Sequence, residues 1–227
     1  MVILDHFAVC ATRLWNRVPA NYHCDIRRAG VIATMKDIYP KASAAEIKLF
    51  GNIWSDVESQ YFTRPIYPQL MDYLDYAFFE TWTYKLDGKT PETEAVWLIR
   101  IKTAQDLVKN RRAEPVVNTD LGNYWYALSS LLLVREDGRG IAWSQKLPPD
   151  DVLEKVCGLD LGAFLEDFRK WGVVYQREWT KGKLVVNPSD SISYFVSLEG
   201  IYTYLETGKT VQGITLPPKT GKIFMKY

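Results

Sequence analysis

Apolar residues recur at helical spacing through much of the first half of the chain. After the segment PKASAAE, five of them fall at steps of 3, 4, 3 and 4 and so share one helical stripe: Ile47, Phe50, Trp54, Val57 and Tyr61. Ser43 and Glu46 have the spacing of a capping box, in which each side chain bonds to the backbone N–H of the other residue. The pattern therefore predicts a helix that begins near residue 43.

Further helices follow from the same spacing. One begins near Pro68 and another lies around residues 97–108, and the segment CDIRRAGVIATMKDIY has a helical composition. The apolar residues on these two later faces are Leu70, Leu74 and Phe78, and then Trp97, Ile101, Ala104 and Val108. Helices with one apolar stripe bury it against each other, so we predict an α-helical bundle over residues 1–114 that serves assembly or partner binding.

The pattern changes after KNRRAEPVVNTD, which has the composition of a linker. LGNYWYALSSLLLV, PPDDVLEKVCG and SLEGIYTYLE predict helices, and IAWSQKL predicts a short strand. Residues 161–171 repeat apolar side chains at helical spacing up to Gly172, and VVYQREW, TKGK and KLVV predict a hairpin. The expected fold is mainly α, with an α+β domain over residues 119–206 and a basic tail over residues 207–227.

This order of elements resembles the winged helix-turn-helix superfamily over residues 121–206. The resemblance rests on DDVLEKVCGLDLGAFLEDFRKWGVVYQ and YFVSLEGIYTYLE, and GLDLGAFLEDFRKWGVV is also similar to winged-helix segments of bacterial and phage replication-initiation proteins. The resemblance implies a paired-helix unit followed by a wing. It thereby implies a transcriptional regulator, or an accessory factor of replication or of a mobile element.

The charge distribution limits where duplex DNA could be contacted. The net charge of +1 gives no general attraction to a polyanion, and the helix predicted over residues 158–172 carries Asp160, Glu166 and Asp167, which would repel phosphates and favour a protein partner. The hairpin and tail carry the cations predicted to contact nucleic acid, which are Arg169, Lys170, Arg177, Lys181, Lys183, Lys209, Lys219, Lys222 and Lys226. The alternatives are a solvated turn for the hairpin and a loosely ordered terminus for the tail.

The sequence offers little for catalysis or metal binding. His6, Cys10, His23 and Cys24 are zinc-ligand types, but adjacent His23 and Cys24 point poorly toward one centre. Both GKT segments lack the first glycine of a phosphate loop, and no serine elbow or HExxH motif occurs. We therefore predict a non-enzymatic protein without metal, cofactor or small-molecule substrate.

Composition adds location and a second hypothesis for function. No apolar run has the roughly 20 residues that span a bilayer, and three cysteines without a CxxC motif favour a reducing compartment, so we predict a cytoplasmic protein. Aromatic residues make up 14% of the chain, more than a minimal core needs, which favours self-association or a protein interface. The alternative to nucleic-acid binding is thus an adaptor or inhibitor whose winged helix binds protein.

Overall fold

The computed structural model describes residues 2–4, 24–53, 66–120, 122–136, 138–144 and 148–226. The chain divides into two compact units. The first comprises Met1–Glu80 and Lys102–Val116, and the second comprises Thr81–Ile101 and Val117–Tyr227. The division passes through α4 (Glu94–Asn110) and β4 (Glu114–Asn118).

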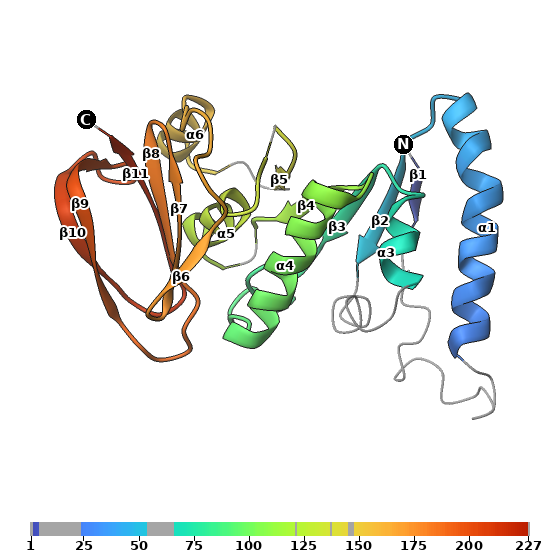
Figure 1. Cartoon of the computed structure of the whole chain (residues 1–227), viewed down its shortest axis with the longest axis horizontal. Coiled ribbons are helices and arrows are strands. Elements are labelled where there is room, and N and C mark those ends of the chain that lie inside the picture. The colour runs from blue at the N-terminus through green and yellow to red at the C-terminus, as the bar shows by residue number, and fades with distance from the viewer. Residues whose placement is uncertain are drawn as a thin grey trace. The chain divides into compact units, whose positions relative to one another are not determined.

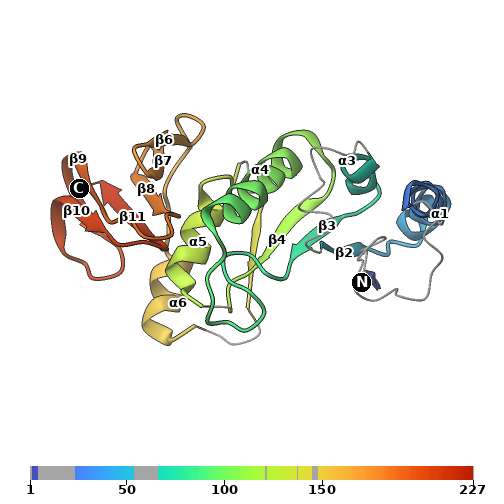
Figure 2. The same ribbon diagram turned by 90° about the horizontal axis from the view of Figure 1, so that it is seen from below.

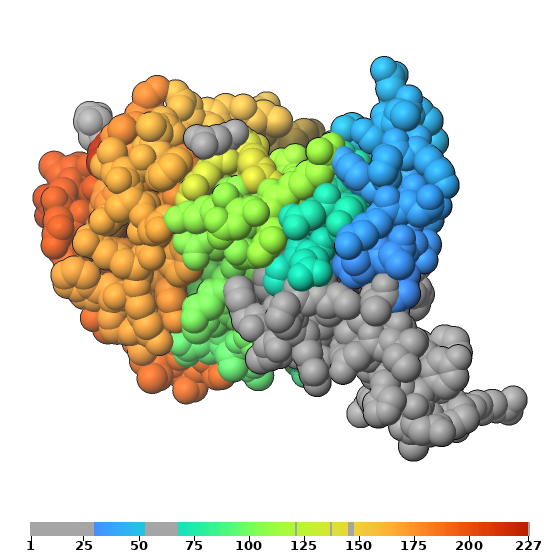
Figure 3. All heavy atoms as spheres, turned by 45° about the vertical axis from the view of Figure 1, so that its right-hand side comes forward, coloured from blue at the N-terminus to red at the C-terminus, as the bar shows by residue number. Residues whose placement is uncertain are grey.

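The first unit is built on parallel strands. β2 (Leu49–Ile53) pairs in parallel with β1 (Val2–Leu4) and with β3 (Tyr76–Phe79), in a sheet of order β1-β2-β3-β4-β5 (Figure 1). Parallel strands need crossover connections, and two helices lie between them in sequence, α1 (Cys24–Ala44) and α3 (Ile66–Met71). α1 lies against α3, which the surface view also shows (Figure 3).

The second unit is built on an antiparallel sheet of order β10-β9-β11-β8-β7-β6. Its helices and the short strand that precede the sheet are α5 (Tyr124–Leu132), β5 (Ile141–Trp143) and α6 (Asp150–Cys157). The strands are β6 (Arg169–Trp171), β7 (Val174–Trp179), β8 (Gly182–Asn187), β9 (Tyr194–Tyr204), β10 (Thr210–Leu216) and β11 (Thr220–Lys226).

Both faces of this sheet contribute to a core. One face packs on α5, which runs alongside β11 (Figure 2). Gly221 of β11 allows this approach, because a Cβ there would lie 2.5 Å from Cβ of Ser129. On the other face, side chains of β7 to β11 pack against each other in a buried apolar cluster. Its members are Val174, Val185, Val196, Leu198, Tyr202, Tyr204, Leu216 and Phe224.

The prediction of a mainly α protein is wrong, because the described part of the chain has about as much strand (34%) as helix (about 30%), which makes the fold α+β. The helix predicted to begin near residue 43 is also wrong, because α1 ends there. The Ser43–Glu46 spacing lies at the end of α1, where the N–H of Ile47 donates to the carbonyl of Ala42 and Glu46 has a left-handed φ of 56°. Residues 49–53 then form β2, and α3 is followed by β3 where one long helix was predicted.

Two of the helices predicted for the winged-helix domain are wrong too. Residues 158–168 contain no helix, and Gly162 has a φ of 73° at a point where a Cβ would collide with Thr180. The closing helix predicted from SLEGIYTYLE is part of β9 instead. There the buried residues alternate, which is the period of a strand; they are Val196, Leu198, Tyr202 and Tyr204.

Several predicted elements are confirmed. α4 buries Trp97, Ile101, Ala104 and Val108 as its spacing predicts, and α5, α6 and the β7–β8 hairpin lie where the sequence places them. The segment predicted as a basic tail over residues 207–227 differs, because residues 210–226 contribute β10 and β11 to the sheet, and β11 lies between β9 and β8. Within the described ranges, none of the helices has the length and apolar character needed to cross a membrane.

Candidate active site at the strand ends

The carboxyl ends of β2 and β3 bring an amide and a carboxylate together in the first unit. Asn52 is the fourth residue of β2, and Glu80 directly follows β3. The strands are parallel and Asn52 is paired with Phe78, so both polar side chains lie at the same edge of the sheet. Ligands of open α/β sheets bind outside the carboxyl ends of the strands, so a ligand site is expected at this end of the sheet.

The two side chains are hydrogen-bonded to each other. Nδ2 of Asn52 donates to Oε2 of Glu80 at 3.2 Å. Asn52 is buried and Glu80 is half-buried. The Glu80 side chain is therefore hydrogen-bonded to a buried amide and is still partly accessible to solvent. This arrangement fixes the orientation of one carboxylate at the surface of the sheet.

Aromatic rings continue the same face. Side chains alternate along a strand, so Phe50 shares the face of Asn52, and Tyr76 and Phe78 share the face of Glu80. The ring of Phe50 lies 5.4 Å from that of Phe78 and 6.2 Å from that of Tyr76. All three rings are half-buried. The face therefore combines a partly accessible aromatic surface with one oriented acid.

Asp75 anchors the strands that carry this pair. It lies at the opposite end of β3, where its carboxylate accepts the N–H of Leu49 at 2.9 Å and pairs with Lys48 at 3.2 Å and Arg112 at 3.5 Å. Burial alone raises the pKa of Asp75, but these hydrogen bonds outweigh it and the pKa lies below its ordinary value of 3.8. The ionised carboxylate thus ties the start of β2 to the start of β3.

This anchor predicts an acid sensitivity. Because the folded pKa of Asp75 is lower than the unfolded one, its stabilisation is complete above the unfolded value and is lost as the pH falls through the folded value. We expect the thermal unfolding midpoint to drop as the pH is lowered below about 4. Asp75→Asn should have a lower midpoint at neutral pH and a smaller further drop in acid, followed by circular dichroism. An equal drop in both proteins would contradict the role given to Asp75.

A second polar cluster lies at strand ends in the other unit. The hydroxyl of Ser144, after β5, donates to the carboxylate of Asp120, after β4, and Asn118 accepts the N–H of Asp120 at 2.9 Å. A serine nucleophile is normally activated by a stronger base such as histidine. The described residues include no histidine side chain, so the cluster by itself does not amount to a nucleophilic site.

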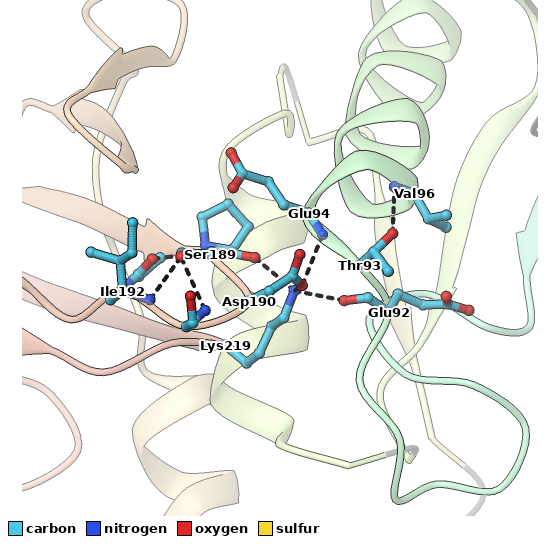
Figure 4. Close-up of polar contacts among 11 residues, drawn as sticks. Glu92, Thr93, Glu94, Val96, Ser189, Asp190, Ile192 and Lys219 are labelled. Atoms are coloured by element: carbon cyan, nitrogen blue, oxygen red, sulfur yellow. Dashed lines mark hydrogen bonds and ion pairs between the residues drawn. The ribbon is translucent and has the colours of Figure 1, made fainter.

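Lys219 joins the N-terminus of α4 to the loop after β8 (Figure 4). Its Nζ donates to the carbonyls of Glu92 and Pro188 and pairs with Asp190, each at 2.7 Å, while Asp190 also accepts the N–H of Glu94. The three donors of the ammonium group are thereby matched by three acceptors. This cluster is a structural link and leaves no group of Lys219 for catalysis.

Removal of this link should destabilise the second unit. We expect Lys219→Met to lower the free energy of unfolding by about 2 kcal/mol, since two carbonyls lose a charged donor. Lys209→Met, at an exposed position, is the matched control and should change it by less than about 0.5 kcal/mol. Denaturant unfolding measures both, and similar values for the two variants would mean that the link contributes nothing.

Eight of the nine cations predicted to contact nucleic acid are in ion pairs. The pairs are Arg169–Glu166, Lys170–Glu94, Arg177–Glu136, Lys181–Asp160, Lys183–Glu178, Lys219–Asp190, Lys222–Glu206 and Lys226–Glu178. The Arg177 and Lys183 side chains are only 1% and 3% exposed, so neither can reach a phosphate. Lys209 is exposed in the turn before β10.

The carboxylates predicted to bind a partner lie in a loop, not on a helix. Asp160 pairs with Lys181 and accepts the N–H of Gly162, and Glu166 pairs with Arg169. Asp167 is exposed in the same loop. The structure thus distributes them along residues 158–168 instead of on one helical face.

The zinc-ligand types lie beyond what the structure describes. His6, Cys10 and His23 are outside the described residues, as is the side chain of Cys24. Among the residues that are described, no group of three or more histidine, cysteine or acidic side chains could hold a metal ion. The absence of a bound metal or cofactor in the protein stays a prediction.

Sequence reasoning missed the Asn52–Glu80 pair because helices were predicted over both strands. The signal was present in YAFFE, a run of aromatic residues that ends in an acid, and in LFGNI. Aromatic and β-branched residues favour strands. Comparison of the sequence with known protein families and with curated proteins finds no match.

Proposed function

We propose that the protein is a hydrolase that acts on carbohydrate, with Glu80 as its proton-transferring group. The hydrogen bond from Asn52 to Glu80 at the carboxyl ends of parallel strands carries this proposal. A positioned carboxyl group is the usual acid of glycoside cleavage. The half-buried rings of Phe50, Tyr76 and Phe78 favour a sugar substrate, since the C–H face of a sugar ring packs on an aromatic face.

The chemistry follows from the position of one acid. In its protonated form Glu80 donates a proton to the glycosidic oxygen as the bond from that oxygen to the anomeric carbon breaks. The water oxygen bonds to the anomeric carbon as the glycosidic bond breaks, and the proton released by this water returns through solvent to the Glu80 carboxylate. Asn52 keeps the carboxyl group in one orientation through both steps, which is the contribution of a positioning residue.

Release of reducing ends from a panel of oligosaccharides tests this function. We expect the wild-type protein to cleave at least one of them and Glu80→Gln to cleave the same substrate at least about 100-fold more slowly. Asp37→Asn is the matched control, because Asp37 is an exposed carboxylate of α1 paired only locally with Lys41. Wild-type protein without activity on any glycoside, or full activity of Glu80→Gln, would contradict the proposal.

Binding of duplex DNA, binding of a protein partner and a cytoplasmic location stay predictions. The ion pairs of the basic residues weigh against DNA binding, because neutralised cations release few counterions. We expect wild-type protein to show no duplex binding at 50 mM salt, a condition that favours electrostatic contacts. Tight binding that falls with salt and is lost in Lys209→Glu would instead favour the nucleic-acid hypothesis.

A further inference from the structure

A small hollow lies at the edge of the core of the second unit, between β7, β8 and β9. It measures about 60 Å³, and Gln176, Lys183 and Tyr194 are among the residues that line it. A water molecule occupies roughly 30 Å³ in the liquid. The hollow therefore has room for a small substituent, such as a hydroxymethyl group, and not for a whole ligand.

Two exposed aromatic side chains also line this hollow. Trp171 of β6 is 53% exposed and Phe195 of β9 is 64% exposed. Phe195 rests on the backbone of β10, since a Cβ at Gly213 would lie 2.7 Å from its ring. Exposed aromatic side chains that lie together beside one hollow, unlike exposed apolar residues scattered singly, mark a candidate binding surface. The hollow is thus flanked by ring surfaces, one of them supported from below.

A buried amide opens into the hollow without a partner. Gln176 is 4% exposed, and within the described part of the chain its side-chain amide makes no hydrogen bond. The neighbouring Lys183 is already paired with Glu178 at 2.8 Å, so the lining has no uncompensated positive charge there. An amide that faces a hollow is solvated there, and a ligand hydroxyl can take the place of that water because it can both donate to the amide and accept from it.

We propose that the hollow, Trp171 and Phe195 bind a neutral polysaccharide, and that this site is separate from Glu80. One sugar ring lies on the aromatic surfaces, and its hydroxyl-bearing substituent reaches Gln176. Lys183 is paired with Glu178 and Glu199 adds a carboxylate to the lining, so the charge of the lining disfavours an anionic ligand.

Affinity electrophoresis of the full chain tests the site. The protein carries Glu80→Gln so that cleavage does not consume the probe, and the gels contain a soluble β-glucan, a xylan, a mannan or anionic heparin. We expect at least one neutral polysaccharide to slow migration. The double variant Trp171→Ala with Phe195→Ala should weaken this binding by about 10-fold or more, and so should Gln176→Leu. Leu86→Ala, at a position 57% exposed, is the control and should bind normally.

The proposed polysaccharide site is contradicted by any of the following results. Migration unaffected by every neutral polysaccharide, retention by heparin alone, or binding that survives the double variant removes the site. Self-association that the double variant abolishes would assign the face to a second copy of the chain. If Gln176→Leu does not fold, the double variant still tests the site. Its two replaced side chains are exposed, and truncation of exposed side chains leaves stability nearly unchanged. Since binding is measured without catalysis, failure here leaves the hydrolase proposal standing, and the reverse also holds.

Discussion

Glu80→Gln should lower kcat on the oligosaccharide substrate by about 10²- to 10⁴-fold, the usual contribution of a positioned general acid or base. Glutamine keeps the size of glutamate and the oxygen that accepts from Nδ2 of Asn52, but it has no transferable proton. The binding of substrate to the aromatic face is unchanged by this substitution. The loss should therefore appear in kcat, while KM changes little.

The variant should remain folded. Glu80 is half-buried and its described hydrogen bond survives as an amide pair, so we expect the free energy of unfolding to change by less than about 0.5 kcal/mol. Asp37→Asn removes an exposed carboxylate of the same unit and should retain wild-type kcat. Loss of activity in both variants would show that general acid–base chemistry has been misassigned.

Arg177→Leu should lower the free energy of unfolding by about 3–5 kcal/mol, the cost of breaking a buried charge network. The guanidinium group donates to the carbonyls of Leu133, Arg135 and Glu166 at 2.8–3.0 Å and pairs with Glu136 at 3.1 Å. Leucine removes the donor to three carbonyls and the ion pair of Glu136, and water replaces these buried interactions only in part.

Arg169→Leu is the matched control. Arg169 also lies in the β6–β7 region and pairs with Glu166, but its side chain is 49% exposed. An exposed ion pair contributes little, so we expect a change of less than about 1 kcal/mol. Thermal unfolding of both variants measures the difference, which should amount to roughly 10 °C in midpoint for a chain of this size. Equal midpoints would contradict a structural role for Arg177.

Secondary structure is predicted correctly from the sequence where the apolar spacing of a segment fits only one type of element. α4 and α5 each have a long apolar stripe that packing retains, and Asn123 caps α5 by accepting the N–H of Tyr126 at 3.2 Å. The β7–β8 hairpin follows from its turn residues and alternating side chains. Local preference and tertiary packing agree in these elements.

The failures come from segments whose spacing fits two structures. Ile47, Phe50 and Trp54 match a helical stripe, yet Phe50 lies in a five-residue strand that pairs on both sides. Pairing with distant strands overrides a local period, and that pairing is not visible in one segment. The stripe from Leu161 to Trp171 fails for another reason, because Leu165 is 58% exposed and the ring of Phe164 packs on Trp179 from a loop.

The candidate site was missed for the same reason. Asn52 and Glu80 are 28 residues apart, and they meet only because β2 and β3 are adjacent parallel strands. Once 47–61 and 68–78 are taken as helices, no register brings the two side chains together. The cations of the hairpin were visible in the sequence, but Glu136, the carboxylate partner of Arg177, lies far from it along the chain.

Proton donation by Glu80 to the leaving group is tested by comparing Glu80→Gln with the wild-type protein on two glycosides that share a sugar and differ in leaving group. A nitrophenolate departs without protonation, whereas a sugar alcohol requires a proton from the acid. We predict that kcat/KM falls by about 10²-fold or more for the saccharide and by less than about 10-fold for the nitrophenyl glycoside. Equal losses on the two substrates, or no loss on either, would contradict Glu80 as the proton donor.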